Sequence, residues 1–294
     1  MVLNVKNVSK NFGKFTALSQ VNLQINKGEV FGFIGPNGAG KTTMIRTILG
    51  IYQASAGSVT VFGQDAWKEA VDIHKRMAYV PGDVNLWPNL TGGEVIDLFI
   101  QLRGGKTSGR KDALIARFKL DPTKKCRTYS KGNRQKVALI AAFATDADFY
   151  LFDEPTSGLD PLMERVFHEC VMEVKAAGKS VLLSSHILTE VEKLCDRVAI
   201  IRDGQIIENG TLEDLRHLTR VNVKVKTQRP FSLETLTGIY DPTSDSDGYT
   251  IFQVESNHLG AAIHHLSSFE IVDLQSSPPS LEELFMNHYE GGDA

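Results

Sequence analysis

Apolar and polar positions predict alternating strands and helices in the first part of the chain. Residues alternate between apolar and polar from Val21 to Ile25, which is typical of a strand with one buried face. Val30–Ile34 is a short apolar run that suits a strand buried on both faces. Apolar residues after Lys41 recur at the spacing of a helix. The segment between the Val30–Ile34 strand and this helix is therefore expected to be a strand-to-helix loop. The expected apolar face of that helix consists of Met44, Ile45, Ile48 and Leu49.

The middle of the chain, from about Asp83 to Ser130, has a helical pattern. Thr91 and Glu94 stand at the spacing of a capping box, in which each side chain bonds the other residue's backbone N–H. The apolar positions that follow have the i, i+3, i+4, i+7 spacing of one helix face. These positions are Val95, Leu98, Phe99 and Leu102. We therefore expect residues 83–130 to form a helical insert.

Two further apolar runs flank another predicted helix. FYLF stands before Asp153, VLLSS starts at Val181, and the helix between them begins at Pro161. The residues expected to face inward on this helix are Val166, Phe167, Cys170, Val171 and Val174. Strand, helix and strand in this order predict a right-handed parallel unit. Asp203 and Gly204 then separate two short apolar runs, as in a tight hairpin turn.

The pattern changes beyond about Thr211. Short alternating runs (VNVKVKT, YTIFQV, FEIVDL) mix with helical stretches and a closing SLEELFMNHY. The chain is therefore expected to have a larger domain over residues 1–212 and a small α+β domain over residues 213–294.

Composition narrows the class of protein further. The 294 residues are 42% hydrophobic and 23% charged, with a formal net charge of -3, so nothing in the overall charge favours nucleic acid or an anionic membrane. Three cysteines in no CxxC pair indicate neither a disulfide framework nor a zinc site, and they suit a reducing cytosol. The N-terminus lacks the apolar core of a signal peptide, and the apolar runs are too short for a bilayer span. A membrane role is expected to come through a partner.

The loop GPNGAGKTT, from Gly35 to Thr43, predicts a phosphate site. It matches GxxxxGK[ST] at Gly35, Gly40, Lys41 and Thr42. Glycines let backbone N–H groups turn toward phosphate oxygens, the following helix presents its positive N-terminus, Lys41 adds a charge, and the Thr42 hydroxyl can bind Mg²⁺. The alternative is a flexible glycine turn, which leaves the flanking strand and helix without a role.

Two acidic residues end the FYLFDEP strand. Asp153 can hold the Mg²⁺ shell, and Glu154 can orient or deprotonate an attacking water. The alternative is a solvated acidic turn. Further upstream, Ser130 in YSKGNRQK precedes an apolar helix and, taken alone, is an ordinary N-cap.

The motifs GPNGAGKTT, YSKGNRQK, FYLFDEP, SGLD and SSH, in this order, resemble the ATP-binding cassette family of transporter ATPases. The resemblance covers about residues 1–212. It implies an α/β fold with a P-loop NTPase (RecA-like) core, an antiparallel β subdomain and an α-helical subdomain, followed by the small C-terminal α+β domain. It also implies ATP and Mg²⁺ as cofactors, and two cassettes that close head to tail on ATP.

The resemblance also implies roles for single residues. Glu154 and His186 would be catalytic, as the base and as the switch histidine that contacts the γ-phosphate. Thr42 and Asp153 would bind the metal. The implied nucleotide-binding residues are Phe12, Gly35, Pro36, Asn37, Gly38, Ala39, Gly40, Lys41, Thr42, Thr43, Ser130, Gly132, Asn133 and Asp160.

Each residue outside the phosphate loop has its own implied task. Ser130 and Gly132 would contact the γ-phosphate bound by the other subunit, and Asp160 would communicate between the two sites. Phe12 stands where the family stacks an aromatic ring on adenine, and Phe15 is a nearby alternative.

The chain departs from the family pattern in two places. Lys131 replaces the first glycine of the usual signature, and Asn133 replaces its glutamine. Gly82 stands where the family usually has a glutamine that reaches both Mg²⁺ and the membrane partner. Asp83 follows and could take over that contact, although an anion meets the metal differently from an amide.

A single cassette resembles the stand-alone ATPase subunit of a bacterial transporter. The YSKG signature, NLWPNLTGGE and the ending SLEELFMNHY together resemble exporters of the drug, antibiotic or polysaccharide type. The implied partners are a second cassette, in a homodimer or heterodimer, and an integral membrane permease, with no nucleic acid. The expected location is the cytoplasm, on the inner face of the membrane. One alternative is a soluble, non-transport cassette ATPase that acts on ribosomes or DNA. A small-molecule kinase is another alternative, but it leaves YSKGNRQK and SSH unexplained.

Overall fold

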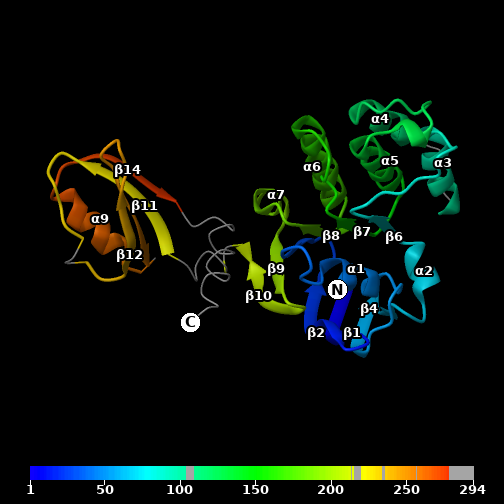
Figure 1. Ribbon diagram of the computed structural model, residues 1–294, viewed down its shortest axis with the longest axis horizontal. Coiled ribbons are helices and arrows are strands. Elements are labelled where there is room, and N and C mark those ends of the chain that lie inside the picture. The colour runs from blue at the N-terminus through cyan, green and yellow to red at the C-terminus, as the bar shows by residue number, and fades with distance from the viewer. Residues whose placement is uncertain (104–108, 213, 215–219, 234–235, 256, 278–294) are drawn as a thin grey trace. The chain divides into compact units, whose positions relative to one another are not determined.

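The chain divides into two units, Met1–Asn209 and Gly210–Ala294, each with a hydrophobic core of its own. The sequence-based boundary lies after residue 212. The computed structural model describes residues 1–103, 109–212, 214, 220–233, 236–255 and 257–277 (Figure 1). No helix among these residues is long and apolar enough to cross a membrane.

A six-stranded sheet forms the centre of the first unit, in the order β10-β9-β3-β8-β7-β6. Its strands are β3 (Val30–Ile34), β6 (Met77–Val80), β7 (Phe149–Asp153), β8 (Ser180–Ser185), β9 (Arg197–Arg202) and β10 (Gln205–Thr211). The pairs from β6 to β9 are parallel. Every residue of β3, β7 and β8 is buried, which confirms the prediction from their apolar runs. Asp203 and Gly204, at φ 48° and 75°, form the predicted turn between β9 and β10.

A second, antiparallel sheet has the order β2-β1-β4-β5. Its strands are β1 (Leu3–Phe12), β2 (Phe15–Ile25), β4 (Ala56–Val61) and β5 (Gln64–Asp65). The alternation predicted from Val21 to Ile25 is confirmed, because the apolar residues are buried and the polar ones exposed. Helix α1 (Lys41–Ile48) contacts both sheets with the predicted apolar face. It therefore fixes the phosphate loop between them.

The helical insert lies beside the β6 end of the large sheet (Figure 1). It contains α3 (Gly92–Leu102), α4 (Gly109–Arg117) and the short helix Cys126–Thr128, and α5 (Lys131–Phe143) packs against α3 and α4. The capping box of α3 is confirmed: Thr91 Oγ1 accepts from the Glu94 backbone N–H, and the Glu94 side chain accepts from that of Thr91. These hydrogen bonds lower the pKa of Glu94.

The predicted apolar face of α3 is only partly correct. Its fully buried apolar residues are Val95, Ile96 and Ile100. Leu102 is 71% exposed. The helix is apolar on more than one side, so spacing alone could not tell which side meets the core.

Helices α6 (Pro161–Ala176) and α7 (Leu188–Leu194) pack on the large sheet and on each other, and α2 (Ala70–His74) lies near β6. All five residues expected to face inward on α6 are buried. Asp160 caps α6 and Pro161 is its first residue, as a helix start requires.

The described residues of the second unit form a four-stranded antiparallel sheet of order β12-β13-β11-β14, together with helix α9. The elements are β11 (Arg220–Thr227), β12 (Ile239–Ser244), β13 (Thr250–Glu255), α9 (Leu259–Ser267) and β14 (Ile271–Ser277). Its core contains Val223, Val225, Phe252, Val254, Ala262 and Leu266. The helix expected in SLEELFMNHY lies outside the described residues.

Candidate functional site

The phosphate loop joins β3 to α1 and depends on glycine at two places. Gly40 precedes α1 with φ 109°, a left-handed conformation that other residues rarely adopt. A Cβ on Gly35 would lie 2.4 Å from the Ile201 carbonyl oxygen of neighbouring β9. Both glycines are therefore required by the backbone, and a flexible turn does not explain them.

Lys41 is the first residue of α1 and is 5% exposed. Its ammonium donates to the carbonyl oxygens of Gly35 at 2.6 Å and Pro36 at 3.1 Å. It also lies 3.5 Å from Glu154 Oε1. The cation is thus held over its own loop, on the side that faces Glu154.

Asp153 is buried at the end of β7 and joins two hydroxyls. Thr42 Oγ1 donates to one carboxylate oxygen at 3.1 Å, and Ser184 Oγ of β8 donates to the other at 2.6 Å. The carboxyl ends of adjacent parallel strands meet at one edge, which brings these three oxygen-bearing side chains together. Oxygen donors of this kind suit Mg²⁺. The described residues hold no cluster of three or more His, Cys, Asp or Glu side chains arranged for a metal.

Glu154 follows Asp153 with φ 50°, which is uncommon for a residue with a side chain. Its backbone N–H donates to the Ser184 carbonyl at 3.0 Å, so the turn is fixed to β8. The carboxylate lies between the Lys41 ammonium, 3.5 Å from Oε1, and the His186 imidazole, whose Nδ1 is 3.3 Å from Oε2. His186 itself is half exposed, directly after β8.

A pocket of about 160 Å³ opens over these groups. Most of the loop from Pro36 to Thr43 lines it, together with Glu154, Ala17 and Phe15. Phe15 is 66% exposed. Phe12 does not line this pocket; its ring packs edge-on against Tyr52 with centroids 5.3 Å apart. Phe15 therefore lies closer to the loop than the residue chosen from the sequence.

The signature segment YSKGNRQK, residues 129–136, does not line this pocket. Ser130 caps α5 by accepting from the Asn133 backbone N–H, so its role as an N-cap is confirmed. Lys131 Nζ donates to Ser157 Oγ at 2.7 Å, and a Cβ on Gly132 would lie 2.3 Å from the Gly158 carbonyl oxygen. The segment thus packs against SGLD of the same chain.

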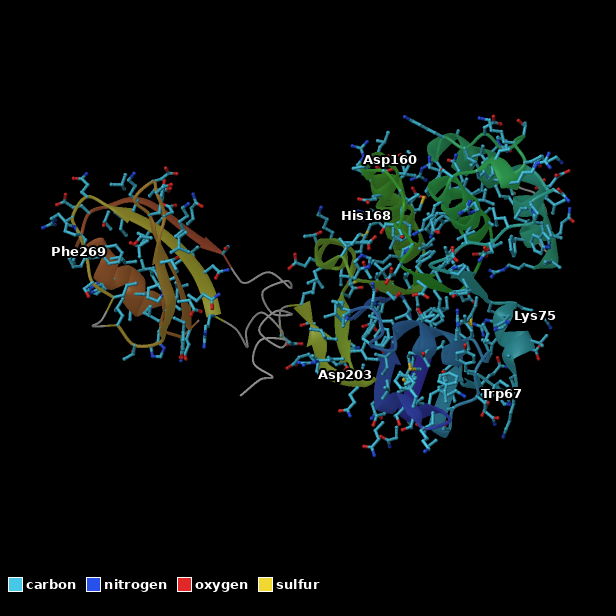
Figure 2. All side chains as sticks on the ribbon, viewed as in Figure 1. Trp67, Lys75, Asp160, His168, Asp203 and Phe269 are labelled. Carbon is cyan, nitrogen blue, oxygen red and sulfur yellow. The ribbon has the colours of Figure 1, made fainter. Side chains whose placement is uncertain are left out.

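Asp160 also lies outside the pocket, at the start of α6, where it accepts from the Met163 N–H at 3.0 Å (Figure 2). The structure brings together the phosphate loop, Asp153, Glu154 and His186. It does not bring Ser130, Gly132, Asn133 or Asp160 to the same pocket.

The loop after β6 approaches the site through Gly82. A Cβ on Gly82 would lie 3.1 Å from the Asp153 carbonyl oxygen, so this backbone passes close to Asp153. Asp83 is exposed, does not line the pocket, and accepts from Asn85 Nδ2 at 3.5 Å.

Sequence reasoning missed two residues that support the site. Ser184 orients Asp153, and buried Gln135 of α5 donates to the Pro155 carbonyl at 2.9 Å. Gln135 thereby ties α5, which packs against the helical insert, to the turn after Glu154. In the sequence, Gln135 is only a polar residue near the start of an apolar helix. An exposed residue would give the same pattern, so the sequence does not identify Gln135 as buried.

The sequence of the chain is similar to those of known proteins. A family model described as ABC transporter matches residues 18–157. The chain is 32% identical to the uncharacterized ABC transporter ATP-binding protein YhcH of Bacillus subtilis, over 97% of this chain and 95% of that protein. It is 31% identical to the Nod factor export ATP-binding protein I of Cupriavidus pinatubonensis, over 97% and 90%. It is 30% identical to the linearmycin resistance ATP-binding protein LnrL of Bacillus subtilis, over 97% of each.

Solved structures agree with the sequence relatives. An ATP-binding subunit of an ABC transporter matches with TM-score 0.69 and 32% identity, over 74% of this chain and 93% of that one. A dimeric ATP-binding cassette in a post-hydrolysis state, bound to ADP and phosphate, matches with TM-score 0.65 and 27% identity, over 71% and 98%.

Proposed function

The chain belongs to the ABC transporter family of ATP-binding proteins, and on that premise we propose that it drives export through a separate membrane permease. As the ATP-binding subunit of an ABC transporter, it binds and hydrolyses ATP. The observation that carries the proposal for its chemistry is the position of Glu154, between Lys41 and His186 in the pocket over the phosphate loop.

The pocket supports a division of labour among the site residues. The backbone from Gly35 to Thr43 and the Lys41 ammonium bind the β- and γ-phosphates. Thr42 and Asp153 would hold Mg²⁺, which would neutralise charge on the phosphate oxygens. The Glu154 carboxylate accepts the proton of the attacking water, and His186 holds the γ-phosphate in line.

The signature segment supports a head-to-tail dimer. Ser130, Gly132, Asn133 and Asp160 lie outside the pocket of their own chain, so they reach nucleotide only from a second cassette. A dimeric cassette among the structural relatives supports this arrangement. Light scattering of the protein with ATP tests it: a chain that turns over ATP at its full rate as a strict monomer would contradict the dimer.

Two relatives support the direction of transport. Their names describe Nod factor export and linearmycin resistance, and a third is a daunorubicin resistance protein of Streptomyces coeruleorubidus. We assign this chain to the inner face of the membrane, as the ATPase of an exporter of the drug, antibiotic or polysaccharide type. Purification from membranes in mild detergent, with identification of the bound protein, tests the assignment. A chain that co-purifies with ribosomes and no membrane protein would contradict it.

Two neighbouring, mostly apolar pockets beside α3 form a groove, and we propose that the permease docks there. One pocket of about 90 Å³ is lined by Phe99 and by alanines of α5, and a neighbouring pocket of about 380 Å³ includes Leu102. Tyr79 lines both, and burial, followed by the charge of Asp153, raises its pKa to about 12. The groove thus includes a residue whose pKa responds to the charge of Asp153, and it suits an apolar cytoplasmic helix of the permease.

Leu102→Glu is expected to reduce permease co-purification about tenfold or more, because it removes an apolar contact and puts a carboxylate beside the permease helix, in a pocket whose lining already includes Arg103 and Lys75. ATPase activity of the isolated protein should stay unchanged, since Leu102 is 71% exposed. Met172→Glu, at an exposed apolar position of α6, is the matched control. Equal recovery of the permease with both variants would contradict the docking assignment.

Phe15 and Phe12 can be separated by nucleotide binding. We assign adenine stacking to Phe15 because it lines the pocket, although the family resemblance favours Phe12. Phe15→Ala is expected to raise the Kd for ATP about tenfold, the value of one aromatic stack, and Phe12→Ala by less than about threefold. Calorimetric titration with ATP measures both. The reverse order would restore the assignment to Phe12.

A further inference from the structure

A buried carboxylate lies behind the loop that carries His186. Glu190 of α7 is 4% exposed and Ser185, at the end of β8, is 2% exposed. Ser185 Oγ donates to Glu190 Oε2 at 2.8 Å. A buried carboxylate is costly unless its contacts compensate the lost water, so this pair calls for an explanation.

The Ser185 hydroxyl connects Glu190 to the backbone on both sides of His186. It accepts from the Ile187 backbone N–H at 3.0 Å. The Ile187 carbonyl oxygen is further away, at 3.4 Å, so the hydroxyl proton goes to the carboxylate. Residues 185 and 187 are thereby locked together, and His186 projects from the turn between them.

The second oxygen of Glu190 faces α6. Among the described residues, Oε1 is buried with no hydrogen-bond partner. His168 Nε2 of α6 lies 3.7 Å from it, beyond hydrogen-bond distance. A shift of a few tenths of an ångström would make this contact a hydrogen bond. The N-cap of the same helix is Asp160, which Figure 2 labels beyond His168.

Packing of α7 does not require this carboxylate. A Cβ on Gly32 of β3 would lie 2.6 Å from Val191 Cγ1 and 3.1 Å from Cys195 Sγ, so α7 already fits closely against the sheet. Val191 and Leu194 supply a buried apolar face. Glu190 is therefore placed for its contacts to Ser185 and His168, since the helix is held without it.

We propose that Glu190 is a positioning residue for His186, and that His168 sets the position of Glu190. The N-cap of α6, Asp160, faces the other cassette in the proposed dimer. A movement of α6 is then transmitted through His168, Glu190 and Ser185 to His186. The inference rests on the proposed function, in which His186 contacts the γ-phosphate.

Steady-state kinetics of Ser185→Ala tests the relay. Loss of one fixed hydrogen bond is expected to lower kcat about tenfold and to change the KM for ATP less than about twofold, because the phosphate loop is intact. Glu190→Gln keeps an acceptor for Ser185 and should lose less than about threefold. Thr189→Ala, at the exposed neighbour of Glu190, is the matched control.

Two further measurements separate positioning from a structural role. In a His186→Ala background, adding Ser185→Ala should slow single-turnover hydrolysis no further, because the two residues act in series. Hydrogen exchange at the Ile187 amide of nucleotide-free Ser185→Ala should be about tenfold faster. If Ser185→Ala does not fold, His168→Ala takes its place: kcat should fall about threefold and recover in His168→Gln, which restores an N–H donor facing Oε1.

The outcomes distinguish the relay from the proposed function. Full kcat in folded Ser185→Ala, or the same tenfold loss when His186 is already absent, overturns the relay. Full activity in His186→Ala alone overturns the role of His186 in the proposed function.

Discussion

Glu154→Gln is expected to lower kcat for ATP hydrolysis about a hundredfold or more, the range measured for loss of a general base. The amide keeps the shape of the carboxylate but cannot accept the proton of the attacking water. The Kd for ATP should change less than about threefold, because Lys41 and the loop backbone are untouched. Phosphate release measures the first quantity and calorimetric titration the second.

The same variant should convert ATP binding into a stable dimer, since hydrolysis no longer separates the two cassettes. Light scattering after addition of ATP and Mg²⁺ measures its mass. Glu173→Gln, which removes a carboxylate on the surface of α6 near Arg117, is the matched control and should remain active. Undiminished turnover in Glu154→Gln would contradict the assignment of the base.

Elements whose signals are local could be predicted from the sequence. The phosphate loop, the buried strands β3, β7 and β8, and the capping box of Thr91 and Glu94 all depend on residues close together in the chain. The hairpin at Asp203 and Gly204 belongs to the same group, because its turn conformation needs only those two residues.

Elements whose position depends on distant packing could not be predicted as well. Strand β12 was missed because it contains Asp241 and Pro242, and proline is rare inside a central strand. It forms because it lies at the edge of the sheet, where it pairs with β13. On α3, apolar residues face both the core and the proposed docking groove. The predicted apolar face therefore includes buried Val95 as well as exposed Leu102.

The candidate site divides in the same way. Asp153, Glu154 and His186 could be placed together because the strands before them were predicted as parallel neighbours, and such strands end at one edge. Ser184, Gln135 and Glu190 gain their roles from contacts across the fold, and nothing in their local sequence distinguishes them from ordinary polar residues. Ser130 does not line the pocket of its own chain, so its proposed nucleotide contact depends on a second cassette.

Lys41→Ala is expected to raise the Kd for ATP about thirtyfold or more, which corresponds to the loss of charged hydrogen bonds to phosphate. The ammonium is 5% exposed and already held by the Gly35 and Pro36 carbonyls, so its position in the pocket is fixed before nucleotide arrives. Removing it also leaves Glu154 without its nearest cation, which adds repulsion toward the γ-phosphate. Calorimetric titration measures the Kd, with exposed Lys193→Ala as the control. Normal ATP affinity in a folded Lys41→Ala protein would mean that the backbone alone binds the phosphates, and the proposed role of this lysine would be wrong.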